Sequence, residues 1–439
     1  MTDTLRTAAR YFVIATMIIA PGGSTAMSAT FDTDAGTSSI GGLADGGLDA
    51  DGNRIFTFAG NLSLTDGANT VTGSRGMRIQ ATGNILLDGP LDMSGANGSV
   101  TKGDGGAGAG IAPLPEFGGG QGGAGMTGNG SPNPSIIGAN VHGEGPQSGA
   151  APLGGGQSGS INNGDANTRA LTGGNNPLCN GDCGSGGAGG ANGGAGGNGG
   201  IRGGQGFGGQ VFGDPDVEGL GTLSGGGGGG GAGSGWAGNS GANGGGALAL
   251  EAGGDLTIGA SASVNLSGGV GGEVPDGDPN SGGGGGAGGT LVLSGNNVNV
   301  DGLASLLADG GEGGKGEHGF GAPNPDFAGG GGGGGRIALY ANDGDVVIDN
   351  IVALAAGDAP LTFLGDSDPY AQLSTAGGPF SSYSGQNTGN GSPQSGGGGS
   401  VYLQAIGGAS LPEPSTLILG LVGAVWITCT GRRRRRNRQ

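Results

Sequence analysis

The sequence predicts an all-β protein: a parallel β-solenoid, or β-helix-like stack, of short three-strand units with long glycine-rich loops, followed by one C-terminal transmembrane helix. Three observations lead to this fold class. Apolar residues alternate with polar ones over short stretches, which indicates β-strands. The order strand, corner, strand returns several times along the chain. Glycine accounts for 122 of the 439 residues but lacks the every-third-residue period of collagen.

The alternating stretches form repeated units. In the first, the stretch 77–81 alternates, a Gly-Asn corner follows, and two further short alternating stretches end near residue 93. Similar units begin at Ala247, Thr290, Arg336 and Ser400, at offsets of 43, 46 and 64 residues. A single unit cannot bury its apolar face, so we expect the five units to stack. We also expect the glycine, asparagine and aspartate residues at the corners to adopt the positive φ of a sharp bend.

The strand units resemble those of filamentous-haemagglutinin-type adhesins and related bacterial surface β-helices. The resemblance covers the units alone and implies a parallel β-helix at a cell surface. A Leu-x-Leu stretch followed by glycine and asparagine is also compatible with a β-sandwich, which remains the alternative fold. The return of the same strand order in each unit favours the solenoid.

Glycine-rich segments separate the units, and the longest runs from Ser99 to Gly245. Its apolar residues are too sparse to build a hydrophobic core. Two interpretations are open. The composition suggests flexible connectors. Alternatively, the segments could pack side by side as polyproline-II-like strands against the flank of the solenoid, which only residues without a Cβ atom allow.

The N-terminus has the pattern of a secretory signal peptide. Arg6 and Arg10 precede a short apolar stretch, and residues 24–26 are the small residues that signal peptidase accepts, with cleavage after Ala26. We therefore expect the mature chain to be exported.

The exported part of the chain is strongly acidic. The whole chain has a formal net charge of -18, and half of its 16 basic residues lie in the two terminal segments. The stretch from Met27 to Leu411 therefore carries 32 acidic and 8 basic residues. Such a surface repels nucleic acid and anionic lipid, which excludes a nucleic-acid partner and favours cations or a hydrated matrix.

The C-terminal stretch 411–439 combines three features in a fixed order. An extended Pro412-Glu413-Pro414 segment comes first, followed by an apolar run from Leu417 to Thr430 and then by an arginine cluster. The cluster consists of Arg432, Arg433, Arg434, Arg435 and Arg436. As a helix the apolar run would span only about 21 Å of the roughly 30 Å hydrocarbon core. We therefore expect a transient anchor whose arginines stay on the cytoplasmic side.

This stretch resembles the PEP-CTERM sorting signal of exported bacterial proteins. The resemblance implies recognition by an exosortase in the inner membrane, cleavage near Pro412-Glu413-Pro414, and transfer to the cell surface or to the exopolysaccharide matrix. An ordinary single-span tail is the alternative. The expected organisation is a signal peptide 1–26, an N-terminal β or cap region 27–75, a first strand unit 76–98, a glycine-rich region 99–245, repeated strand units 246–407 and the sorting signal 411–439.

Two acidic stretches have the spacing of cation ligands. They are Asp49, Asp51 and Asn53, and Asp276, Asp278 and Asn280. Alternate carboxylate and amide oxygens on a tight loop can converge on calcium. Both stretches lack the glycine and glutamate positions of an EF-hand, and ordinary acidic turns are the alternative. Separately, Cys179 and Cys183 could close a small disulfide in an exported protein.

The sequence offers little support for catalysis. His142 and His318 lie in glycine-rich stretches without a partnered serine or cysteine. A β-helix polysaccharide lyase or hydrolase would need clustered carboxylates beside a basic residue, and the basic residues are scattered along the chain. We therefore expect an exported structural protein of the cell surface or exopolysaccharide matrix, without catalytic activity. A carbohydrate-binding adhesin is the alternative, although the tyrosines and tryptophans form no evident platform in the sequence.

Overall fold

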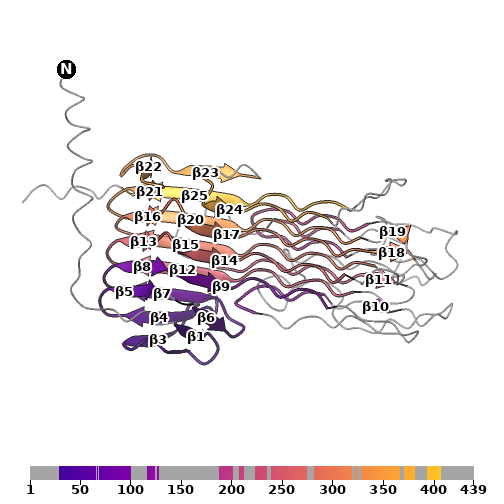
Figure 1. The fold of residues 1–439 in the computed structure, drawn as a ribbon, viewed down its shortest axis with the longest axis horizontal. Coiled ribbons are helices and arrows are strands. Elements are labelled where there is room, and N and C mark those ends of the chain that lie inside the picture. Colours follow the sequence, from indigo (N-terminus) through magenta and orange to yellow (C-terminus); the bar gives the residue numbers. More distant parts are fainter. Residues whose placement is uncertain are drawn as a thin grey trace, which may run out of the picture.

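The computed structural model describes residues 29–65, 67, 69–99, 116–123, 126–127, 187–200, 207–211, 223–234, 239–273, 281–318, 322–323, 328–365, 370–380 and 393–406. Within these residues the regular secondary structure consists of β-strands alone, which confirms the all-β class. Most of them lie in three stacks of parallel strands, and the glycine-rich segments extend sideways from these stacks (Figure 1).

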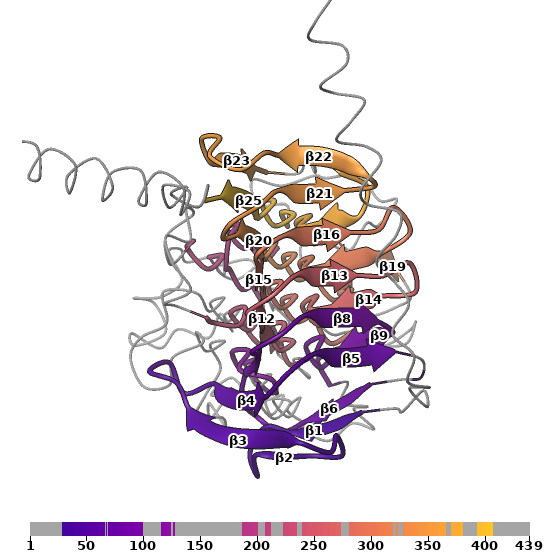
Figure 2. The same cartoon turned by 90° about the vertical axis from the view of Figure 1, so that its left-hand side faces the viewer.

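Three sheets form the body of the fold (Figures 1 and 2). The long sheet contains the parallel strands β4 (Arg54–Phe58), β7 (Met77–Ala81), β12 (Ala247–Ala252), β15 (Thr290–Gly295), β20 (Arg336–Ala341) and β25 (Ser400–Ala405). The middle sheet contains β5 (Leu62–Thr65), β8 (Ile85–Asp88), β13 (Leu256–Ile258), β16 (Val298–Val300) and β21 (Val346–Ile348). The short sheet contains β9 (Pro90–Asp92), β14 (Ser263–Asn265), β17 (Ser305–Leu307) and β24 (Leu373–Ser374).

The chain visits the long, middle and short sheets in turn, and each circuit is here called a coil. This arrangement is compatible with a β-solenoid. The predicted unit starts are in register, because Ala247 pairs with Thr290, Thr290 with Arg336, and Arg336 with Ser400. The alternation predicted from the sequence therefore fixes both the strands and their pairing.

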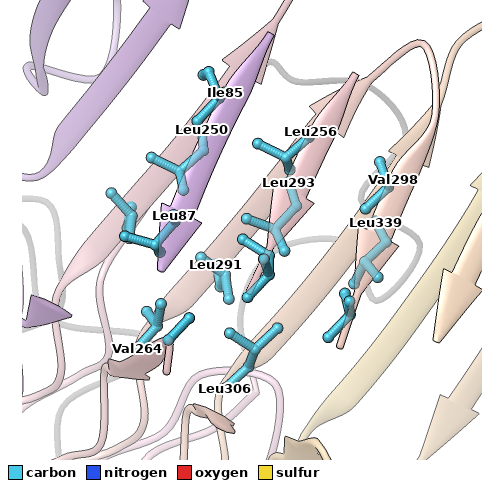
Figure 3. Close-up of a cluster of buried hydrophobic side chains, with 14 of the residues drawn as sticks. Ile85, Leu87, Leu250, Leu256, Val264, Leu291, Leu293, Val298, Leu306 and Leu339 are labelled. Atoms are coloured by element: carbon cyan, nitrogen blue, oxygen red, sulfur yellow. The ribbon is translucent and has the colours of Figure 1, made fainter. Parts of the chain in front are cut away.

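The hydrophobic core fills the space between the three sheets. The inward residues of successive coils stack on one another, as Leu250 does on Leu293 and Leu293 on Leu339. Figure 3 shows these side chains meeting others from the middle and short sheets, such as Leu256 and Val264. All five are fully buried. Each coil therefore contributes one layer to a continuous aliphatic core.

The stack starts earlier than the repeat pattern indicated. β4 pairs in parallel with β7, and β5 pairs in parallel with β8, so the long sheet has a parallel strand before the five predicted units. The remaining N-terminal strands cover this end. They are β1 (Thr30–Asp32), β2 (Thr37–Ser38), β3 (Leu43–Leu48) and β6 (Thr70–Thr72), and β3 pairs antiparallel with β4.

The C-terminal end differs from the prediction in one strand. The pattern assigned Val352 and Leu354 to the third strand of their unit, but β22 (Ile351–Leu354) folds back antiparallel on β21. β23 (Leu361–Leu364) then pairs antiparallel with β25, and β24 takes the place in the short sheet. The folded-back strands cover the edges of the long and middle sheets, which would otherwise present unpaired backbone groups.

The corners between the long and middle sheets also differ from the expectation. Asn84, Asp255 and Asn297 do not have the positive φ expected there. Instead, they form a ladder from coil to coil. The Asn84 Oδ1 accepts a hydrogen bond from the Asp255 N–H at 2.9 Å, the Asp255 Oδ1 accepts one from the Asn297 Nδ2 at 2.8 Å, and the Asn297 Oδ1 accepts one from the Asp345 N–H at 3.1 Å. The corner side chains therefore satisfy backbone groups of the next coil.

Candidate functional site: the glycine-rich bundle

Glycine-rich arms connect the coils and form the most distinctive part of the molecule. Outgoing arms follow the short sheet at 94–99, 266–273, 308–316 and 375–380, and returning arms lead into the long sheet at 239–246, 281–289, 328–335 and 393–399. Segments 117–123, 187–200, 207–211 and 223–234 lie beside them. Figure 1 shows the arms as layers that run sideways from the strands. We call the arms and these segments together the glycine-rich bundle.

The bundle is held together by backbone hydrogen bonds with a period of three residues. In the returning arm 328–335, the N–H groups of residues 329, 332 and 335 donate to the arm 308–316, those of 330 and 333 to the segment 187–200, and those of 331 and 334 to the arm 393–399. The arm 281–289 repeats this pattern with its own three neighbours. A strand with three residues per turn and no internal hydrogen bonds is the polyproline II form.

Glycine is needed in the bundle because the arms approach one another too closely for a side chain. A Cβ atom on Gly332 would lie 1.9 Å from the backbone oxygen of Gly286, and one on Gly284 would lie 1.9 Å from that of Ala188. Both arms are buried along the stretches 282–289 and 328–335. The described segments therefore pack side by side, as the polyproline-II-like interpretation expected, and the flexible-connector interpretation is wrong for them. For the most part they extend sideways from the strands and do not lie against the flank of the stack (Figure 1). The composition suggested flexibility because it shows only that apolar side chains are scarce. It does not reveal a core that is held together by hydrogen bonds between backbone groups.

A few buried side chains join the bundle to the solenoid-like stack. The Asn192 Nδ2 donates hydrogen bonds to the backbone oxygens of Gly288 and Gly289 and to the Thr290 Oγ1, at 2.8, 3.0 and 3.2 Å. Thr290 is the first residue of β15. The Asn243 Oδ1 accepts a hydrogen bond from the Gly122 N–H at 2.8 Å. Asparagine therefore acts as a cross-link at positions where an arm meets a strand or another arm.

The first predicted cation site forms a hydrogen-bonded turn between β3 and β4. The Asp49 Oδ1 accepts hydrogen bonds from the N–H groups of Asp51 and Asn53 at 3.0 and 2.8 Å. The Asp49 Oδ2 accepts one from the Asn53 Nδ2 at 3.1 Å and lies 3.3 Å from the Arg78 Nε. The Asp51 Oδ2 accepts one from the Leu223 N–H at 3.1 Å. These contacts favour the acidic-turn alternative, in which the carboxylates already have partners.

The basic residues near the N-terminal end are grouped in space, contrary to the scatter seen in the sequence. Arg54 pairs with Asp45 at 3.1 Å, Arg75 with Asp34 at 3.6 Å, and Arg78 with Asp49. Arg78 also forms an ion pair with Glu251, whose other carboxylate oxygen accepts a hydrogen bond from the Gln80 Nε2 at 2.8 Å. Arg78 lies on β7 and Glu251 on β12, so this largely buried cluster ties two neighbouring coils together. Sequence reasoning missed it because Arg78 and Glu251 are 173 residues apart.

The structure brings two tyrosines together on the outer face of the long sheet. The ring centroids of Tyr340 and Tyr402 are 5.6 Å apart, and both side chains are buried. Burial, followed by the neighbouring Tyr402, raises the pKa of Tyr340. Aligning the repeated units would have found the pair, because Tyr402 pairs with Ala338, two residues from Tyr340 on the same face of the sheet. A buried pair is not a solvent-exposed platform for a sugar ring.

A second charged group lies on neighbouring outgoing arms of the bundle. The Lys315 Nζ lies 3.7 Å from the Glu273 Oε2. The pKa of Glu312 is raised by burial, then by the Glu273 carboxylate, against the smaller lowering effect of Lys315. Within the described parts of the chain, no group of three or more histidine, cysteine, aspartate or glutamate side chains has the arrangement of a metal site.

Several predicted site residues lie outside the described residues. They are Ala26, Cys179, Cys183, Asp276, Asp278, Asn280, the Pro412-Glu413-Pro414 motif and Arg432 to Arg436. The apolar run 417–430 lies outside as well. Among the residues that are described, no helix has the length and apolar character needed to cross a membrane.

Comparisons with known proteins identified no relative. No protein-family model, no curated protein and no solved structure matches the chain.

Proposed function

We propose that this chain is an exported structural protein of the cell surface or exopolysaccharide matrix, built on a β-solenoid and without catalytic activity. The observation that carries the proposal is the glycine-rich bundle, whose backbone donors are directed at neighbouring arms. Such a bundle provides shape and rigidity while offering few side chains for chemistry. This suits a scaffold better than an enzyme, which needs convergent reactive groups.

The charge of the chain supports the same role. The exported part is strongly acidic, whereas Arg54, Arg75 and Arg78 are in ion pairs with carboxylates. The remaining acidic groups hold water and counterions at the surface. A rigid acidic rod of this kind can lie within a hydrated polysaccharide matrix without a specific binding pocket.

The route to the surface is proposed from the two ends of the sequence. Signal peptidase would remove residues 1–26 during export, and the C-terminal tail would hold the precursor in the inner membrane. An exosortase would then act on the Pro412-Glu413-Pro414 motif and release the folded part to the surface or matrix. The strand β25 ends at Ala405, so the motif follows shortly after the last coil.

Replacing all three motif residues with alanine tests the sorting step. We expect the variant to remain in the inner membrane fraction, because the tail is no longer a substrate, while the unchanged chain reaches the surface. Ser415→Ala with Thr416→Ala is the matched control on the same stretch, and it should be displayed normally. Equal surface labelling of the motif variant and the unchanged chain would contradict the sorting assignment.

Incubation of the purified chain with polysaccharides tests the structural assignment. We expect no turnover of any acidic or neutral polysaccharide and no selective retention on a glycan array. Release of new reducing or unsaturated ends would contradict the absence of catalytic activity. Selective glycan retention would favour the adhesin alternative.

A further inference from the structure

The C-terminal end of the stack exposes apolar side chains on the folded-back strands. On β22, Ile351 and Val352 are 63% and 47% exposed, and on β23, Leu361 and Leu364 are 38% and 61% exposed. Ile406, the residue after β25, is 48% exposed. We call these five side chains the C-terminal cap. Leu354, which also lies on β22, is buried, so this strand has both a core position and exposed positions.

The cap lies at the very end of the stack. β22 is the edge strand of the middle sheet and β23 is the edge strand of the long sheet. Figures 1 and 2 both place these two strands beyond all the others at the top of the molecule. Exposed aliphatic side chains on the last strands of a stack are a candidate interaction surface.

The direction of the chain indicates what this surface meets. The chain passes from Ile406 to the apolar run that begins at Leu417, and the ten intervening residues span at most about 36 Å when fully extended. If the apolar run lies in a bilayer, the cap is the part of the described fold that the chain holds closest to the membrane. A short tether raises the effective concentration of the cap at the bilayer surface. A contact that would be weak between a free protein and a bilayer can therefore form.

The composition of the cap suits uncharged lipid. The stretches 351–365 and 400–406 contain no lysine or arginine, and Asp358 is their one charged residue. An anionic surface would therefore gain nothing from electrostatic attraction, whereas exposed leucine, isoleucine and valine side chains can enter the interface between head groups and acyl chains.

We propose that, in the membrane-anchored precursor, the C-terminal cap rests on the surface of the bilayer through Ile351, Val352, Leu361, Leu364 and Ile406. This inference rests on the proposed function, because it requires that the tail anchor the chain before sorting. The contact orients the rod with its N-terminal end away from the membrane. It also holds the Pro412-Glu413-Pro414 motif beside the bilayer, where a membrane-embedded processing enzyme acts.

Site-directed fluorescence on the full-length chain tests the contact. Cys179, Cys183 and Cys429 are replaced with serine, and an environment-sensitive fluorophore is attached to Val352→Cys or to Leu48→Cys. Leu48 on β3 is the matched control, because it is also 47% exposed but lies at the opposite end of the stack. Each protein is reconstituted at low density into phosphatidylcholine vesicles with and without a lipid-borne nitroxide quencher. We expect the quencher to reduce fluorescence at Val352 and to leave fluorescence at Leu48 unchanged.

A second variant tests whether the aliphatic side chains make the contact. Ile351→Asn with Leu364→Asn alters exposed positions and should leave the fold intact, as circular dichroism can verify. In this background the quenching at Val352→Cys should fall, while flotation of the protein with the vesicles should not change. Vesicles with added anionic lipid should give no stronger quenching than phosphatidylcholine alone.

The possible failures can be told apart. If the protein floats with the vesicles but neither probe is quenched, the cap proposal is overturned and the membrane anchor stays in place. Failure to float with the vesicles would instead overturn the anchor on which the proposed function depends. If the fluorescence of the Val352 probe changes with protein density in vesicles without the quencher, a second copy of the chain covers the cap. This result would also overturn the proposal.

Discussion

Substituting alanine for Gly332 tests whether the glycine-rich bundle is a true core of the protein. Gly332 lies in the arm 328–335, where its N–H donates to the Gly311 backbone oxygen at 2.9 Å and its own oxygen accepts from the Gly378 N–H at 2.7 Å. The added Cβ would lie 1.9 Å from the Gly286 backbone oxygen and 2.5 Å from the Gly286 carbonyl carbon. Both obstructing atoms belong to the backbone, so no side chain can rotate to make room.

The expected loss of stability follows from this overlap. The two arms would have to part by about 1 Å before the contact becomes tolerable. Such a shift breaks or weakens roughly two buried backbone hydrogen bonds, each of which costs about 1–3 kcal/mol when left unmade. We therefore expect Gly332→Ala to lower the free energy of unfolding by about 2–6 kcal/mol, a large part of the roughly 5–15 kcal/mol of a typical domain.

Urea unfolding followed by circular dichroism measures the effect, and Gly397→Ala is the matched control. Gly397 lies in the neighbouring arm 393–399, but a Cβ there would be 3.5 Å from the nearest heavy atom, the Ala195 backbone nitrogen. Neither glycine has a positive φ, so alanine is equally compatible with both backbones. We expect Gly397→Ala to change stability by less than about 1 kcal/mol. Equal unfolding midpoints for the two variants would refute the packed-bundle interpretation.

Three further predictions concern the ladder, a raised pKa and the bundle's period. Asn297→Ala removes hydrogen bonds to two neighbouring coils and should cost about 1–3 kcal/mol of unfolding free energy, whereas Asn299→Ala, on the outer face of β16, should cost less. For Glu312, burial raises the pKa in the folded state, so its stabilising contribution is complete below the unfolded value of 4.5 and is lost as the pH rises through the raised pKa. Glu312→Gln should therefore flatten the fall in stability above pH 4.5. Deleting three consecutive glycines from Gly329–Gly335 removes one full turn, so the remaining N–H groups should still point at their present neighbouring arms. Deleting one glycine should rotate the following N–H groups by a third of a turn, away from these neighbours, and unfold the arm.

Each of these predictions has a measurement and a contradicting result. Thermal or urea unfolding compares the two asparagine variants, and equal losses would remove the special role of the ladder. A titration of stability against pH tests Glu312, and an unchanged slope in the Glu312→Gln variant would remove the link between its burial and stability. Amide hydrogen exchange of the arms compares the two deletions. Stronger protection in the one-residue deletion than in the three-residue deletion would contradict the three-residue period.

The sequence was informative where a strand makes its own pattern. Alternation in the stretch 77–81 and at the starts Ala247, Thr290, Arg336 and Ser400 was sufficient to predict strands, their repetition and their parallel register. Burial of every second residue is a local property, so it is visible without any knowledge of the fold. The apolar residues of β4 and β5 also suggested strands, but their place in the repeat was not recognised. The third strand of that circuit differs from those of the later units, because β6 pairs with β1 and does not join the short sheet.

Features that depend on distant pairing could not be predicted in this way. Val352 and Leu354 fit the strand pattern locally, and only the open edge of β21 explains why they fold back. The pairing of Arg78 with Glu251 required two coils to become neighbours across the longest glycine-rich stretch. The packing of the bundle could not be predicted from its side chains, because backbone hydrogen bonds hold it together. A glycine-rich sequence has the same composition whether or not these bonds form.

The long gap between the first two predicted units determines when the N-terminal coils can be completed. Met77 on β7 pairs with Leu248 on β12, although 171 residues separate them, whereas Ala247 and its partner Thr290 are 43 residues apart. At a synthesis rate of about 5–20 residues per second, β7 would wait roughly 10–30 s for its partner. During that interval its aliphatic face and open strand edge are accessible to other chains. The C-terminal coils, by contrast, can form in quick succession, so a delay in the longest glycine-rich stretch would expose one particular strand to misassembly.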